Sequence, residues 1–185
     1  MRLTKPRVQP LDDADLSAEQ KEILEPLGRG GRVFNIFRTM IHHPVLFKNW
    51  LGFANYVLGR RSTLGARERE LAILRIGWLC QAEYEWGQHV IIGKQSGLTD
   101  ADIDLIAKGP DADGWDPFDA LICRAVDELH NDKMISDATW KGLSARYSEQ
   151  QMLDLVFAVG QYNLVSMALN TFGVQLDPGI EGFKK

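Results

Sequence analysis

The chain has 185 residues, of which 45% are hydrophobic and 25% are charged. This composition is typical of a globular protein with a substantial core, and it excludes disordered and collagen-like chains. There are 21 Lys and Arg residues against 25 Asp and Glu residues, so the formal net charge is −4 at pH 7. That balance disfavours nucleic acids and anionic membranes as partners. The two cysteines form no CxxC or zinc-ligand pattern and no apolar signal segment opens the chain, so we expect a cytoplasmic protein.

Residues 1–32 are predicted to form an N-terminal arm and a first helix. Pro6 and Pro10 favour an extended arm that lies over another surface of the protein. Ser17 and Gln20 form a capping box, which starts a helix that continues to Pro26. The glycines at 28–31 then predict a flexible connector.

Residues 33–178 show helical patterning throughout. Apolar residues recur at spacings of three and four, with capping residues where helices begin and Gly or Pro where they end. The expected helices lie at 34–42, 44–58, 66–80, 82–95, 99–107, 117–130, 136–145 and 148–172. No run of β-branched residues predicts a strand, so the expected fold class is all-α, followed by a tail at 179–185.

The helix at 66–80 is apolar on nearly every side, and the helix at 82–95 carries ionisable groups on its apolar face. Glu85 and His89 are four positions apart, so their side chains share one face and can exchange a proton. Burial raises the pKa of a carboxyl group and a nearby imidazolium lowers it, which allows a tuned acid/base pair. The same spacing also fits a structural ion pair on a solvated face, and spacing alone does not decide between the two.

The segment RERELAILRIGWL, followed by EYEWGQHVIIGKQSGLTDADI, resembles the carboxymuconolactone decarboxylase and alkylhydroperoxidase D-like (AhpD-like) proteins. With less specificity the similarity extends over residues 33–178. The resemblance implies a helical bundle of seven to nine helices and a homo-oligomer (dimer, trimer or hexamer). In the family pattern, Glu70 matches the glutamate of the first motif helix and His89 matches the histidine of the second.

The peroxidase branch of the family has a CxxC pair where this chain has Ala82 and Glu85. Thiol peroxidase chemistry needs one thiol to attack the peroxide and another to resolve the product, so the resemblance favours the decarboxylase branch. It implies a cofactor-independent acid/base enzyme that decarboxylates or isomerises a small organic acid, lactone or ring-cleavage product. His89 is then the general acid or base, Glu85 its proton partner, and Glu70 the carboxylate that orients the imidazole.

Four further residues are candidates for substrate contact. Arg75 is one of the few charges on the central helix and would balance an anionic substrate, although a buried partner for Glu85 or another carboxylate fits it as well. Trp86, Tyr162 and Phe37 are aromatic residues suited to an apolar pocket, and their helical spacing fits a core position equally.

Three other interpretations start from the same residues and from Cys80. Glu70, Glu85 and His89 could hold a divalent ion, but zinc sites draw on more His or Cys and no HExxH occurs, so no metal is expected. Peroxide reduction through a lone Cys80 remains an alternative function. The third is a non-catalytic binding protein that has lost the family activity.

Overall fold

The computed structural model describes residues 3–28 and 31–183, which form nine α-helices and one 3-10 turn. Their order is α1 (Ala18–Leu24), η1 (Glu25–Leu27), α2 (Asn35–Met40), α3 (Pro44–Leu58), α4 (Ala66–Leu79), α5 (Glu83–Gln95), α6 (Asp100–Lys108), α7 (Pro117–Asn131), α8 (Asp137–Ser144) and α9 (Glu149–Phe172). No strand occurs within the described ranges, so the all-α prediction is confirmed. The predicted connector at 28–31 includes residues 29 and 30, which lie outside them.

The helices begin where their capping residues predict. Ser17, Thr99 and Ser148 each accept a hydrogen bond from the backbone three residues on, and the side chain of that residue bonds back to the cap. Pro44 opens α3, and His43 Nδ1 accepts a hydrogen bond from the backbone N–H of Leu46. These contacts satisfy backbone groups that a helix end leaves without partners.

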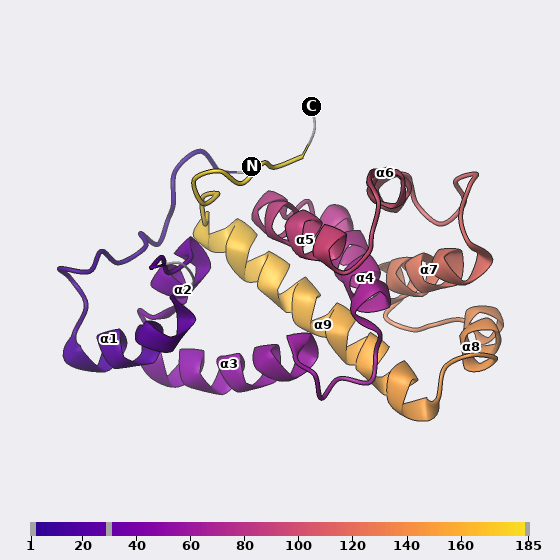
Figure 1. The fold of residues 1–185 in the computed structure, drawn as a ribbon, viewed down its shortest axis with the longest axis horizontal. Helices are drawn as coiled ribbons and strands as arrows, with labels where there is room; N and C mark the ends of the chain where they lie inside the picture. Colours follow the sequence, from indigo (N-terminus) through magenta and orange to yellow (C-terminus); the bar gives the residue numbers. More distant parts are fainter. Residues whose placement is uncertain (1–2, 29–30, 184–185) are drawn as a thin grey trace.

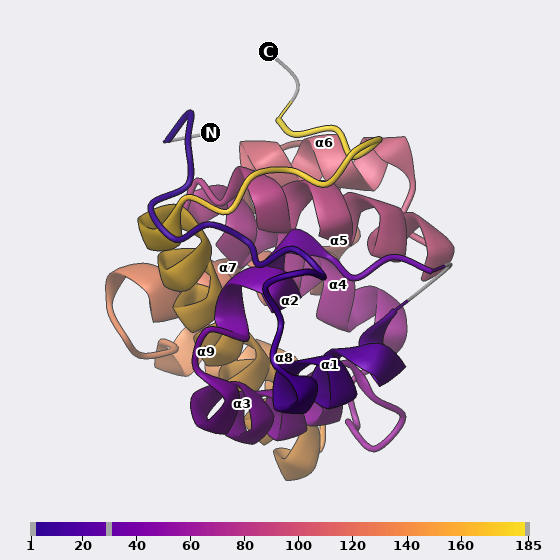
Figure 2. The ribbon, with the colours of Figure 1, turned by 90° about the vertical axis from the view of Figure 1, so that its left-hand side faces the viewer.

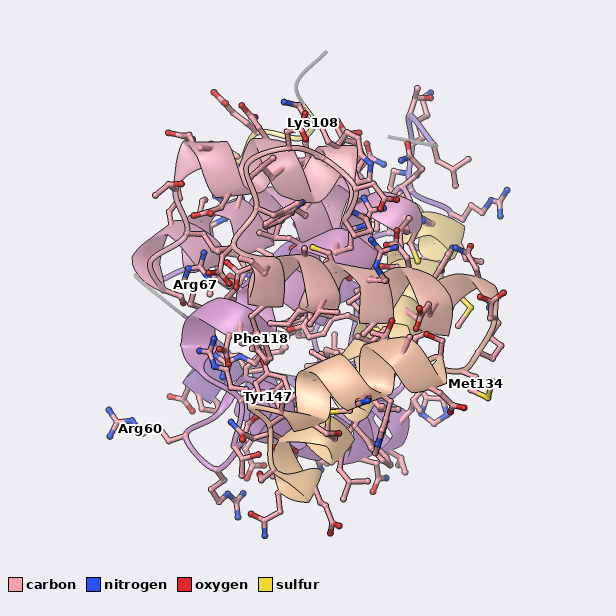
Figure 3. All side chains as sticks on the ribbon, turned by 90° about the vertical axis from the view of Figure 1, so that its right-hand side faces the viewer. Arg60, Arg67, Lys108, Phe118, Met134 and Tyr147 are labelled. Carbon is pink, nitrogen blue, oxygen red and sulfur yellow. The ribbon has the colours of Figure 1, made fainter. Side chains whose placement is uncertain are left out.

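The centre of the fold is α4, which packs against α5, α6, α7 and α9. Residues 69–77 of α4 are all buried, as the sequence predicted for a helix that is apolar on nearly every side. In Figure 1, α9 runs diagonally across the molecule, with α1–α3 on one side of it and α4–α8 on the other. On the face shown in Figure 3, the rings of Phe118 and Tyr147 join α7 to the start of α9, with centroids 4.9 Å apart.

The N-terminal arm lies over the ends of α2 and α9, as expected. The backbone N–H of Arg7 donates to the Phe172 carbonyl at 2.8 Å, and that of Leu11 donates to the Arg38 carbonyl at 3.1 Å. The arm crosses the same side of the molecule as the C-terminal segment (Figure 2). The boundaries proposed for the arm, the helical domain and the tail stay a prediction.

The segment after α9 packs against the helices. Asp177 is 2% exposed, and its carboxylate accepts hydrogen bonds from Tyr84, Gln88 and the backbone of Asn35. Farther along, the ring of Phe183 packs 5.0 Å from Trp78, centroid to centroid. The tail therefore covers one side of α5.

By length and composition α9 could cross a membrane, with a mean hydropathy of 1.4 over its most apolar window. Within this protein 56% of that window is buried, because α9 packs against α3, α4, α5, α7 and α8. This burial is that of a core helix. The cytoplasmic location expected from the sequence stays a prediction.

Candidate functional site

Glu70 and His89 form a buried pair between the two central helices. Antiparallel α4 and α5 are joined by a tight turn, in which the Ala82 backbone N–H donates to the Gly77 carbonyl at 2.9 Å. Glu70 Oε2 lies 2.6 Å from His89 Nδ1, and the two residues are 0% and 6% exposed. Gly93 allows this close approach, because a Cβ there would lie 3.3 Å from Leu74 Cδ1 on α4.

Glu85 is also buried, but it does not bond His89 directly. Its Oε2 accepts a hydrogen bond from Ser166 Oγ of α9 at 3.2 Å, while Oε1 has no partner and faces Gly77. Burial raises the pKa of Glu85 well above its usual value; the Ser166 hydrogen bond opposes this shift and the charge of Glu70 adds to it. Burial therefore favours the neutral carboxylic acid form of Glu85. The pairing of Glu85 with His89 that the spacing suggested is not formed, and Glu70 takes that place.

Tyr162 of α9 closes the site on a third side. Its ring meets the imidazole of His89 edge-on, with centroids 4.8 Å apart and planes at 85°. Burial raises the pKa of the Tyr162 phenol, with further increases from Glu85 and Glu70 and a decrease from Arg69. Tyr162 thus remains a neutral phenol next to the imidazole.

Arg69 and Ser166 are site residues that the sequence did not single out. Arg69 is 8% exposed, and its Nε lies 3.5 Å from Glu70 Oε1. A residue that precedes Glu70 is normally expected on another helix face, but α4 is buried all round. For Ser166 a signal existed, because it lies four positions after Tyr162 on α9.

Arg75 does not serve the site, which corrects its assignment to the substrate. Its Nε and Nη2 bond both carboxylate oxygens of Asp127 at 2.6 and 2.7 Å, and Nη1 donates to the Ile106 carbonyl at 2.8 Å. This bidentate pair, together with the end of α6, occupies the guanidinium. The alternative of a buried partner for another carboxylate is the one that the structure shows.

The other two aromatic candidates pack in the core. Phe37 belongs to the cluster around α1–α3, with its ring 5.9 Å from that of Phe47. Trp86 packs 5.1 Å from Trp78 and 5.6 Å from Phe183. Both rings thus pack against other aromatic rings, and the assignment of Phe37 and Trp86 to substrate contact stays a prediction.

The two cysteines lie in different environments. Cys80 is partly exposed; its thiol donates to Asn163 Oδ1 at 3.2 Å and lies 3.9 Å from His130 Nδ1. Cys123 is fully buried, and burial raises the pKa of its thiol. Within the described chain no group of three His, Cys, Asp or Glu residues is arranged to hold a metal ion.

A separate apolar groove of about 770 Å³ runs between α3 and α9. The groove is lined by side chains that include five large, exposed hydrophobic residues: Leu46, Phe53, Phe157, Leu164 and Met167. None of the three residues Glu70, Glu85 and His89 lines it. The groove and the acid/base pair are therefore distinct features.

Comparison with known proteins identifies the fold. Residues 44–122 match the model of the Carboxymuconolactone decarboxylase family. An uncharacterized peroxidase-related protein with an alkylhydroperoxidase AhpD core from Ralstonia eutropha superposes with a TM-score of 0.80 at 18% identity, over 94% of this chain and 93% of that one. A peroxidase-related protein from Silicibacter superposes with a TM-score of 0.80 at 15% identity, over 95% and 96% of the chains.

A third similar structure is the debrominase Bmp8 in complex with 2,3,4-tribromopyrrole. Its TM-score is 0.73 at 16% identity, over 95% of this chain and 94% of that one. Among curated proteins no relative matches at a significant level. The resemblance inferred from the sequence and the AhpD-like helical bundle are both confirmed.

Proposed function

We propose that this chain, whose residues 44–122 carry the carboxymuconolactone decarboxylase family domain, is an acid/base enzyme that works without an organic cofactor. The observation that carries the proposal is the buried contact of 2.6 Å between Glu70 Oε2 and His89 Nδ1. The reaction is a decarboxylation or a double-bond migration in a small organic acid, lactone or ring-cleavage product. The substrate class comes from the family, and the chemistry from the site.

His89 transfers the proton in this mechanism. When its Nδ1–H donates to the Glu70 carboxylate, Nε2 carries the free electron pair, and it makes no hydrogen bond to a described residue. Nε2 then takes a proton from a substrate carbon, and Glu70 stabilises the imidazolium that forms. Returning this proton to another carbon completes a double-bond migration. In a decarboxylation His89 starts as an imidazolium that has taken its proton from water; the substrate carboxylate leaves as CO₂, the imidazolium protonates the carbon that carried it, and the neutral imidazole is restored.

Glu85 supplies a second acid. A neutral carboxylic acid donates a hydrogen bond to a carbonyl oxygen on which negative charge develops, and so stabilises an enolate-like intermediate. Two residues position Glu85 for this role. Ser166 on α9 donates a hydrogen bond to one of its oxygens, and Gly77 on α4, which has no side chain, leaves room for the other. The site therefore combines one proton-transferring imidazole with one neutral acid.

The proposal is tested by deuterium exchange and turnover with a panel of unsaturated lactones and acids. We expect wild-type protein to exchange a substrate proton with D₂O, and His89→Ala to lose both exchange and turnover by a factor of at least about 100. The matched control is His43→Ala, because His43 caps α3 and does not contact the site. If His89→Ala retains full exchange, or no wild-type exchange occurs with any substrate, the enzymatic proposal fails and a non-catalytic binding role is favoured.

A second candidate function is peroxide reduction at Cys80, favoured by the imidazole 3.9 Å from its sulfur. A Cys80 thiolate would attack the peroxide O–O bond, giving a sulfenic acid and an alcohol, and an external thiol would have to reduce the sulfenic acid. Buried Cys123 is not suited to that resolving step. Mass spectrometry after mild peroxide treatment decides: sulfenic acid at Cys80 supports this function, and an unmodified Cys80 excludes it.

We also propose that the chain forms a homo-oligomer through the α3–α9 groove. Five groove residues expose large apolar side chains, from 36% for Phe53 to 57% for Phe157. At roughly 100 Å² each, they form an apolar patch of several hundred Å², the size that marks protein interfaces. A second copy would bury this patch and would leave the acid/base pair within each protomer.

A further inference from the structure

Arg69 differs from the other two arginines of α4 in its hydrogen bonding. Arg67 makes ion pairs with Asp102 and Asp119, and Arg75 is bound at both ends of its guanidinium by Asp127. The side chain of Arg69 makes no hydrogen bond to any described residue, although the residue is only 8% exposed. Its one charged contact is the 3.5 Å approach of Nε to Glu70 Oε1.

This contact leaves both atoms without a hydrogen bond. Arg69 Nε and Glu70 Oε1 are each fully buried and have no hydrogen-bond partner. A guanidinium presents five N–H donors, and burying them without acceptors is costly. Glu70 Oε1 lies 3.5 Å from Nε and makes an ion pair with it, but no hydrogen bond. A buried cation in this condition is suited to an anion that enters from outside.

The position of Arg69 places such an anion at the acid/base pair. The charge of Arg69 acts on the phenol of Tyr162, and the Tyr162 ring packs 4.8 Å from the imidazole of His89. Arg69 also directly precedes Glu70, the partner of His89. Arg69, Glu70, His89 and Tyr162 therefore form one chain of contacts that joins α4, α5 and α9.

The charges of this region do not repel an anion. Arg69 balances the negative charge of Glu70, and buried Glu85 and Tyr162 are neutral. An entering carboxylate thus meets a region with no net charge rather than two carboxylates. The sequence had assigned this balancing role to Arg75, but Asp127 already neutralises that residue.

We propose that Arg69 binds the carboxylate of the substrate and holds it beside His89. This inference rests on the proposed acid/base function and narrows its substrates to small molecules that bear a carboxylate. Arg69 becomes a residue that determines specificity, because its planar fork matches a carboxylate in a way that a neutral amide or ester does not. The carboxylate also supplies the acceptors that Arg69 lacks in the free protein.

Isothermal titration with benzoate and benzamide tests the proposal, because the two probes share size and shape but differ in charge. We expect wild-type protein to bind benzoate, and Arg69→Gln to weaken benzoate binding about tenfold or more with little change for benzamide. Arg69→Lys is expected to retain part of the benzoate affinity. Arg124→Gln is the matched control, since Arg124 is a half-exposed arginine on α7 that pairs with Asp111. Its benzoate affinity should equal that of wild type.

A measurement on unmodified protein covers the case in which Arg69→Gln does not fold. In ¹H–¹⁵N spectra of the arginine side chains, the Nε–H signal of Arg69 should shift on addition of benzoate and stay in place with benzamide. The proposal is overturned if wild type binds no benzoate, if both probes shift the signal alike, or if Arg124→Gln weakens benzoate binding as much as Arg69→Gln does.

Further outcomes distinguish a failure of the role proposed for Arg69 from a failure of the proposed acid/base function. His89→Ala should still bind benzoate in preference to benzamide, since Arg69 and not His89 is the anion receptor. Benzoate binding through Arg69 without any turnover would contradict the acid/base function alone. Turnover of a carboxylate substrate with an unchanged KM in Arg69→Gln would contradict the role of Arg69 alone.

Discussion

Glu70 Oε2 and His89 Nδ1 lie 2.6 Å apart in a buried contact between α4 and α5. When Nδ1–H donates a hydrogen bond to the carboxylate, Nε2 is left as the basic nitrogen of the imidazole. This arrangement fixes both the tautomer and the orientation of the imidazole. The proposed mechanism therefore has a defined proton acceptor before any substrate binds.

Replacing the orienting carboxylate should impair proton transfer without unfolding the protein. In Glu70→Gln the side chain can still bond His89, but it carries no charge to stabilise the imidazolium. We expect the rate of substrate proton exchange to fall by roughly two to four orders of magnitude. Glu149→Gln, on the exposed first turn of α9, should leave the rate unchanged. Equal rates for Glu70→Gln and wild type would contradict the assignment.

The buried acid Glu85 makes stability depend on pH. Its pKa is raised above the ordinary value of 4.5, so the folded protein keeps a proton that the unfolded chain releases. The stabilisation from this group is complete below that ordinary value and is lost as pH rises toward the raised pKa. In Glu85→Gln the amide replaces the neutral acid, and we expect the free energy of unfolding to fall less between about pH 5 and pH 8 than in wild type. Urea denaturation at several pH values measures this.

The control for that experiment is Glu22→Gln, because Glu22 is exposed on α1. Its unfolding free energy should follow the wild-type pH dependence. A Glu85→Gln profile parallel to wild type would show that Glu85 ionises in the folded protein as it does in the unfolded chain.

Docking of the tail should depend on Gly87. A Cβ at this position would lie 2.5 Å from the Glu181 carbonyl oxygen and 2.7 Å from Ile180 Cγ2. Gly87→Ala should therefore displace the tail, speed hydrogen exchange at the Ile180 amide, and change tryptophan emission as Phe183 leaves Trp86. Gly52→Ala on α3, where no atom lies within 4 Å of the added Cβ, should instead stabilise the protein by up to about 1 kcal/mol. Unchanged exchange at Ile180 in Gly87→Ala would contradict this account.

Self-association should depend on the α3–α9 groove rather than on exposed apolar side chains in general. Met167 is 56% exposed and lines the groove, whereas Met134 is 69% exposed at the turn between α7 and α8 (Figure 3). Sedimentation velocity should show an oligomer for wild type and for Met134→Glu, and monomers for Met167→Glu, because a charge in the interface loses its hydration. A wild-type protein that stays monomeric at all concentrations would refute the proposed oligomer.

The sequence predicted the helices well because their signals are local. The hydrogen bonds that start α1, α6 and α9 join residues three positions apart, so a short stretch of sequence contains both partners. The position of α4 at the centre was predictable for a similar reason, since apolar residues surround it. Family resemblance added Glu70, which periodicity alone did not connect to His89.

Partner choice among the charged residues was not predictable, because it depends on contacts distant in sequence. His89 has a glutamate four positions before it, yet it pairs with one 19 positions away, across the turn between α4 and α5. The partner of Arg75 lies 52 positions along the chain, on α7. The side chain of Arg75 has hydrogen-bond acceptors, and that of Arg69 has none among the described residues. This difference depends on the packing of α7 and α9 against α4, and no local sequence pattern carries that information.

The arm at the start of the chain and the segment after α9 meet at one end of the molecule. The Gln175 side chain donates to the Leu3 carbonyl, and both ends of the described chain emerge on the same side (Figures 1 and 2). A circularly permuted chain, with the natural ends joined by a short linker and new ends opened between exposed Asp113 and Gly114, should therefore fold to the same bundle. In that permuted chain, α4 and α5 would still be joined by their own turn, and Glu70 would still meet His89.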